Sequence, residues 1–63
     1  MQVGDLVTVA PAKTGIYILV NLNGYEPSGA KLPDCVTLVS LNGPAAGFLL
    51  PMQRQWIEVI NTN

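Results

Sequence analysis

Residues 51–60, "PMQRQWIEVI", carry the clearest signal for the fold of this chain. Pro51 suits the first position of a helical turn, because the N–H that proline lacks would have no partner there. The last five residues of the stretch are β-branched and aromatic in an alternating pattern, which is typical of a strand. We therefore predict a helical turn over residues 51–54 that leads into a closing strand over residues 56–60.

The alternation divides the side chains of this closing strand between two faces. Glu58 is its only charged residue, and we expect that carboxylate to face solvent. The parity then puts Ile57 and Val59 inside, and Trp56 and Ile60 on the outer side. Trp56 is the only tryptophan of the chain. It either packs under a barrel edge or loop, or is displayed to a partner.

Earlier segments carry strand patterns too, and Gly, Asn and Pro residues typical of turns separate them. The further segments expected to form strands are residues 3–10, 14–22, 35–42 and 48–50. The long connection over residues 23–34 contains Tyr25, and a loop of that length in so small a domain is often functional, although a plain surface connection explains it equally well. The chain is thus expected to be one all-β domain over residues 1–63.

The second of these segments, "TGIYILVNL", alternates most clearly. The residues that this alternation assigns to the core are Ile16, Ile18 and Val20. Tyr17 and Leu19 fall on the opposite face, which is therefore partly apolar as well. An apolar second face indicates coverage by a loop or by a partner.

Composition points to contacts with another protein surface. Of the 63 residues, 49% are hydrophobic and 11% are charged, against roughly 25% charged in a typical domain. A domain this small cannot bury so much apolar surface alone, and exposed excess usually marks interfaces. Cys35 is the only cysteine and histidine is absent, so neither a disulfide nor a closed zinc site is expected to stabilise the fold. Self-association or docking on a larger assembly is the remaining way to stabilise the fold.

The charge pattern argues against other partners. The net charge is −1, and the cations Lys13, Lys31 and Arg54 are scattered. Nucleic-acid binding needs several phosphates to be neutralised, so no nucleic-acid partner is expected. No apolar run approaches the roughly 20 residues of a membrane span, and residues 1–11 lack the features of a signal peptide. We expect a cytoplasmic protein with a reduced thiol and no membrane contact.

The residue inventory also argues against catalysis. Without histidine, Ser-His-Asp and Cys-His arrangements cannot form within the chain. Cys35 begins an apolar strand and reads as a small buried hydrophobe. The acidic residues are Asp5, Glu26, Asp34 and Glu58, and their spacing matches no Ca²⁺ loop. The glycines match no phosphate-binding loop. We predict no catalytic residue, no cofactor site and no metal site.

Several short motifs carry a resemblance. "GDLV" near the start, "TGIYILV" in the second strand, and "FLLP" followed by "WIEVI" at the end resemble an SH3-like barrel. The resemblance implies a small five-stranded barrel with one 3₁₀ turn before the last strand, here residues 51–54. More narrowly, the chain is similar to uncharacterised SH3-like proteins of tailed phages, including cyanophages. Many of those begin with a "GDLV"-type strand and end with a "WLEVI"-type strand.

A weaker resemblance concerns an enzyme. The plasmid-type, trimethoprim-insensitive dihydrofolate reductase is a similar small barrel that assembles into a tetramer around one central active site. Its pore-lining Gln-Ile-Tyr would fall near Phe48-Leu49-Leu50 of this chain, which has neither the Gln nor the Tyr there. No site residue is carried over from that family.

The aromatic residues remain as the candidate contact set. SH3-type domains bind extended segments in an aromatic groove beside a long loop, and aromatic side chains are common at interface hot spots. The family's acidic-loop and ALYDY-type signatures are absent, so signalling-type peptide binding is not predicted. The candidate partner-binding residues are Trp56, Tyr17, Tyr25, Leu19 and Phe48.

These observations favour a non-enzymatic interaction module that self-associates or docks on a larger protein assembly. If the chain is of phage origin, that assembly would be a virion or a host protein. Two alternatives stay open: a pore-type homo-oligomeric enzyme resembling the plasmid-type reductase, and a nucleic-acid-associated SH3-like barrel.

Overall fold

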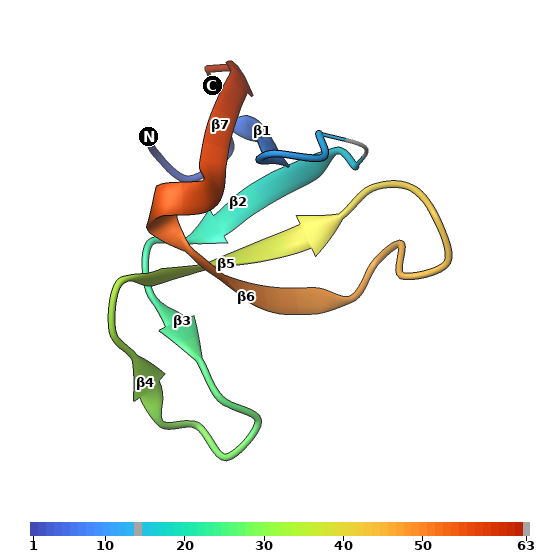
Figure 1. Ribbon diagram of the computed structural model, residues 1–63. Helices are drawn as coiled ribbons and strands as arrows, with labels where there is room; N and C mark the ends of the chain where they lie inside the picture. Colours follow the sequence, from blue (N-terminus) through green and yellow to red (C-terminus); the bar gives the residue numbers. More distant parts are fainter. Residues whose placement is uncertain (14, 63) are drawn as a thin grey trace.

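The computed structural model describes residues 1–13 and 15–62, and its regular secondary structure is almost wholly strand (Figure 1). One antiparallel sheet contains β1 (Leu6–Val9), β2 (Tyr17–Asn21), β5 (Cys35–Ser40), β6 (Leu49–Gln53) and β7 (Ile57–Asn61). The strand order is β6-β5-β2-β1-β7, so β6 and β7 are the two edges. The predicted all-β character is confirmed.

The predicted turn before the last strand is present, but it lies later in the chain. A 3₁₀ turn over Arg54–Trp56 joins β6 to β7. The prediction of a turn over residues 51–54 was wrong in position, because Pro51 to Gln53 belong to β6. The predicted strand at residues 48–50 accordingly extends beyond its expected end.

The direction of its backbone groups explains why β6 accepts Pro51. The hydrogen bonds that flank the β5–β6 pair run from Arg54 N–H to the Asp34 carbonyl at 2.8 Å and from Ser40 N–H to the Phe48 carbonyl at 3.4 Å. In an antiparallel pair, residues that face the partner strand alternate with residues that face away. Odd-numbered residues of β6, including Leu49 and Pro51, therefore point their backbone groups at the free edge. Proline at such a position costs no bond of the ladder.

One face of the sheet, called the inner face here, forms the core. Its fully buried residues are Val7, Leu19, Val36 and Leu38. The half-buried residues that pack against them are Val9, Tyr17, Leu50, Met52 and Ile57. Ile57 was predicted to lie inside and does so, whereas Val59 stays 41% exposed.

The predicted faces of β2 are reversed in the structure. Leu19 is 0% exposed, while Ile16 is 43% and Val20 is 37% exposed. Leu19 is paired with Leu38, which is also fully buried, so both side chains point to the inner face. Alternation alone could not choose between the faces, because both sides of this strand are apolar. Leu19 is therefore a core residue and not a candidate for partner contact.

The opposite, outer face carries an apolar row across four strands. The register pairs Leu6 with Ile18, Ile18 with Val39, and Val39 with Leu49. Residues paired across neighbouring strands lie on one face, so these four side chains form a continuous line. The sequence predicted that a loop or a partner would cover a second apolar face of β2. In the structure, that second face is this outer face.

Part of the outer face is covered by a hairpin within the predicted 23–34 loop. The hairpin consists of β3 (Gly24–Tyr25) and β4 (Lys31–Leu32), and it lies on the side of β5 and β6 away from β7 (Figure 1). The Thr37 hydroxyl donates to the Asn23 carbonyl at 2.7 Å. Gly24 is buried so closely that a methyl group there would meet Cys35 Cβ at 2.6 Å. Glycine at this position lets the hairpin approach the sheet.

Asp5 fixes the start of the sheet. It is 1% exposed, and its carboxylate accepts a hydrogen bond from the Gln2 N–H at 2.8 Å. Its backbone carbonyl accepts a bond from the Leu19 N–H at 3.0 Å. These bonds hold the turn that leads into β1.

Candidate protein-interaction surface

The structure separates the predicted contact residues. Tyr17 is half-buried against the core, and Leu19 is inside it. Trp56 is 44% exposed in the 3₁₀ turn, where its indole N–H donates to Gln53 Oε1 at 3.0 Å. Tyr25 lies beside the outer face and is 41% exposed, and Phe48, directly before β6, is 67% exposed.

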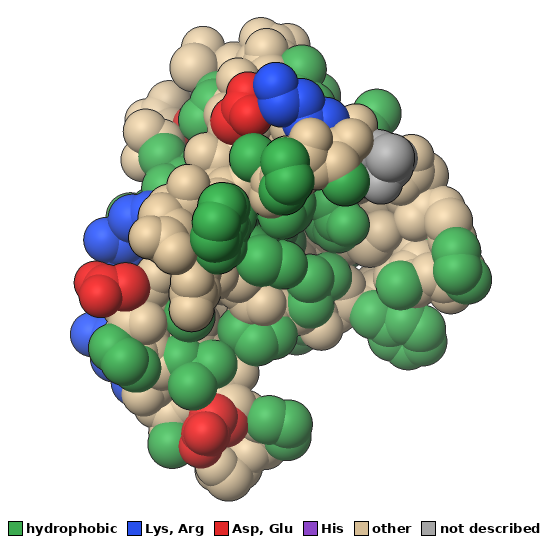
Figure 2. All heavy atoms as spheres, viewed as in Figure 1, with side chains coloured by type: hydrophobic (Ala, Val, Ile, Leu, Met, Phe, Trp, Pro, Cys, Tyr) green, Lys and Arg blue, Asp and Glu red, His purple; other side chains and the backbone are tan. Residues whose placement is uncertain are grey.

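Tyr25 forms one wall of an open groove of about 300 Å³. The residues that line this groove are Tyr25, Glu26 and Pro27 from the hairpin side, and Thr37, Leu49, Leu50 and Pro51 from the sheet. Figure 2 shows the molecule hollowed in this region, between the lobe of the hairpin and the loop that joins β5 to β6. Glu26 contributes the only charge of the lining, so the groove suits apolar side chains.

The groove opens at the edge of the sheet, where the exposure of apolar side chains is greatest. Leu49 is 68% and Phe48 is 67% exposed, the highest values among the large hydrophobic residues that the structure describes. Together with Tyr25, Pro27 and Pro51 they define what we call the β6 edge surface. At this surface, outward-pointing backbone groups of β6 and exposed apolar side chains lie close together.

This arrangement is suited to binding another polypeptide. An exposed edge strand offers N–H and C=O groups to a further strand, and neighbouring pockets take alternate side chains. The groove, the edge backbone and the apolar side chains lie together at one end of β6. A patch of this kind on a small domain commonly marks an interaction site.

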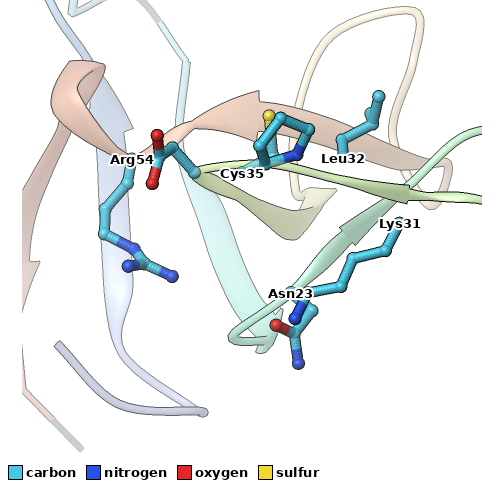
Figure 3. Close-up of a pocket in the computed structure, with 7 residues that line it drawn as sticks. Asn23, Lys31, Leu32, Cys35 and Arg54 are labelled. Atoms are coloured by element: carbon cyan, nitrogen blue, oxygen red, sulfur yellow. The ribbon is translucent and has the colours of Figure 1, made fainter.

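A second hollow, on the hairpin side, is polar (Figure 3). It has a volume of about 420 Å³, and its lining residues are Asn23, Lys31, Leu32, Pro33, Asp34, Cys35 and Arg54. Lys31 and Arg54 extend toward the same side as Asn23 (Figure 3). The Arg54 Nη2 donates to the Leu22 carbonyl at 3.0 Å, which holds the guanidinium in place.

The chemistry of this polar hollow is limited. It brings one thiol, one carboxylate and two cations to an open surface, and the sequence supplies no imidazole to act as a base. Cys35 is half-buried and free. Within residues 1–13 and 15–62, no group of three or more Cys, Asp or Glu side chains is arranged to hold a metal ion. The described part of the chain also contains no helix that is long and apolar enough to cross a membrane.

The other edge strand, β7, is different. Val59 and Ile60 are 41% and 55% exposed. Ile60 is an extra residue in the pairing with β1, since Leu6 pairs with Asn61 and the next residue, Val7, pairs with Val59. Such a bulge twists an edge away from further pairing. The charged residue of this strand, Glu58, forms an ion pair with Lys13 at 3.3 Å.

Comparison with known proteins found no relative of this chain. No protein-family model matches the sequence, and searches of curated proteins and of solved structures found no significant match.

Sequence reasoning missed three residues of the β6 edge surface: Leu49, Pro27 and Pro51. Leu49 was expected only as part of a short strand, and Pro51 as the start of a turn. The signal was present in "FLLP", where proline follows an apolar run, because proline in a strand indicates an edge. Nothing in the sequence placed Pro27 beside that edge, since this contact depends on how the hairpin folds over β5.

Proposed function

We propose that this protein is a non-enzymatic interaction module that binds another protein chain through the β6 edge surface. One observation carries this proposal: the two most exposed large hydrophobic side chains, Phe48 and Leu49, sit next to each other where an edge strand begins. An apolar groove adjoins Leu49. Surface of this kind is unfavourable in water, and contact with a partner removes it.

We further propose that the sheet is an SH3-like barrel and that the chain is a phage accessory protein. The order of the five strands and the single 3₁₀ turn between β6 and β7 support the barrel. The phage origin rests on the similarity of the "GDLV" and "WIEVI" strands to those of tailed-phage proteins. The bound assembly would then be a virion or a host protein.

A capture experiment with matched variants tests the interaction. The tagged protein is immobilised at low density and exposed to a lysate of its native host, and bound proteins are quantified by mass spectrometry. Leu49→Glu places a charge on the β6 edge, whereas Ile60→Glu makes a comparable change on β7. We expect Leu49→Glu to abolish retention of a defined protein that the wild type and Ile60→Glu both keep. Equal retention by all three proteins would show that the β6 edge surface is not the binding site.

A further inference from the structure

The backbone of β6 offers few free groups for pairing, and this limits what can bind there. Leu49 points both its N–H and its C=O at the free edge, as argued above from the alternation of the β5–β6 bonds. Pro51, the next outward-pointing residue, has only a carbonyl to offer. A strand that docks on this edge can therefore form a full pair of hydrogen bonds at Leu49 but not at Pro51.

We infer that the partner of this edge is a second copy of the chain. In this arrangement the two β6 strands pair in antiparallel fashion, with the two-fold axis at Leu49. The inference rests on the proposed function of the β6 edge surface and names its occupant. Each Leu49 N–H then donates to the Leu49 carbonyl of the other copy, which satisfies both edge groups at once.

This register is favoured by the position of proline. With the axis at Leu49, Pro51 falls opposite Gly47 of the second copy, outside the strand. The Gly47 N–H is already donated to the Ser40 carbonyl at 2.8 Å, so it loses nothing by facing proline. An axis at Pro51 would place two proline rings against each other at a position that needs two donors. An axis at Leu50 would place each proline ring against a Leu49 carbonyl.

The same register brings apolar side chains together on both faces. Leu49 meets Leu49 of the other copy on the outer face, beside the groove wall formed by Tyr25. Phe48 meets Leu50 of the other copy at a position without hydrogen bonds, where cross-strand side chains are closest. The surface is self-complementary, as a two-fold contact requires.

Charge and area agree with this occupant. The outward residues of the paired segment are uncharged, so a second copy meets no like charge there. Glu26, on the hairpin, is the one charged residue that lines the adjoining groove. An edge contact of this length covers on the order of 500 Å² per copy, against about 800 Å² in a standard interface. We therefore expect a weak dimer, with a dissociation constant on the order of 10–100 µM.

Sedimentation velocity over about 1–500 µM tests the dimer. The wild type and Ile60→Glu should shift together from monomer to dimer. Leu49→Glu should weaken the association at least about tenfold, because it sets two carboxylates directly opposite each other. A wild type that stays monomeric at the highest concentration overturns the inference, as does a Leu49→Glu variant that dimerises like the wild type. Circular dichroism shows whether each variant is folded.

Cross-linking tests the register independently. Opposed residues in a hydrogen-bonded antiparallel pair have Cα atoms about 5.5 Å apart, within the roughly 4.4–6.8 Å that a disulfide spans. In a Cys35→Ser background, Leu49→Cys should form a disulfide-linked dimer under mild oxidation. Ile60→Cys in the same background should remain monomeric. Equal cross-linking of both variants, or none at Leu49→Cys, contradicts the register.

The two proposals fail in different ways. If the wild type is monomeric but still captures a host protein in a Leu49-dependent manner, the dimer is contradicted and the interaction module is supported. A wild type that dimerises through Leu49 and retains no other protein keeps the dimer and confines the function to self-association. A monomeric protein with no Leu49-dependent capture removes both.

Discussion

The inner face of the sheet and the β6 edge contain similar apolar residues, which are buried at the inner face and exposed at the edge. Leu19 and Leu38 on the inner face are 0% exposed, whereas Leu49 at the edge is 68% exposed. All three are leucines in short antiparallel strands, so residue type does not distinguish them. The difference is in coverage: other side chains of the sheet pack against Leu19 and Leu38, and nothing in the described chain covers the edge.

This comparison separates stability from association. A side chain that is already buried adds to the free energy of unfolding, and a side chain that remains exposed contributes when a partner buries it. Substitutions on the inner face should therefore act on stability, and substitutions at the edge should act on association.

Leu19→Ala should have the largest effect. Truncation of a fully buried leucine lowers the free energy of unfolding by about 2–5 kcal/mol, a large share of the stability of so small a domain. Urea unfolding followed by tryptophan fluorescence measures the loss. Val20→Ala is the matched control, because Val20 is the next residue and is 37% exposed. It should cost less than about 1 kcal/mol, and a larger loss in Val20→Ala than in Leu19→Ala would place the core on the other face.

The β2 strand also shows how far sequence reasoning reaches. Hydrophobic alternation located the strands of the main sheet, and the 3₁₀ turn was expected within a few residues of its place. The choice of inner face depended on Leu38, which lies on β5, after the β3–β4 hairpin, and is paired with Leu19. Pairing across strands fixes that choice, and a single strand with two apolar sides contains no information about it. The groove beside Tyr25 likewise needs the hairpin in place over β5.

Trp56→Ala should reduce stability more than association. About half of the indole is covered, and its N–H bond to Gln53 is lost on truncation. We expect a loss of about 1–2 kcal/mol in the free energy of unfolding. Because Trp56 does not line the groove, the sedimentation profile of the folded variant should match the wild type. A monomeric but fully stable variant would instead assign Trp56 to the contact, as the sequence first indicated.

Pro51→Val should strengthen association at the edge and leave stability nearly unchanged. The substitution restores an outward N–H on β6, which can reach the carbonyl of an opposing strand. One added backbone bond on each copy, worth about 0.5–1.5 kcal/mol, should tighten the dimer by at least about fivefold. Sedimentation velocity measures the change, and Pro51→Ala, which restores the same N–H without a β-branched side chain, should tighten the dimer in the same way. A weaker dimer in Pro51→Val would mean that the proline ring itself makes the contact.

Glu58→Gln, on the opposite edge, should have the smallest effect. The ion pair of Glu58 with Lys13 is solvent-exposed, with 48% and 57% of the two side chains accessible. Exposed pairs are worth roughly 0–1 kcal/mol and weaken in salt, so the unfolding free energy should change by less than about 0.5 kcal/mol. Lys13→Gln should give the same small loss, and 0.5 M salt should remove it from both variants. If Glu58→Gln instead causes association that Leu49→Glu does not suppress, the charge on β7 is what keeps that edge unpaired. The contrast between the two edges would then rest on Glu58 as well as on the bulge at Ile60.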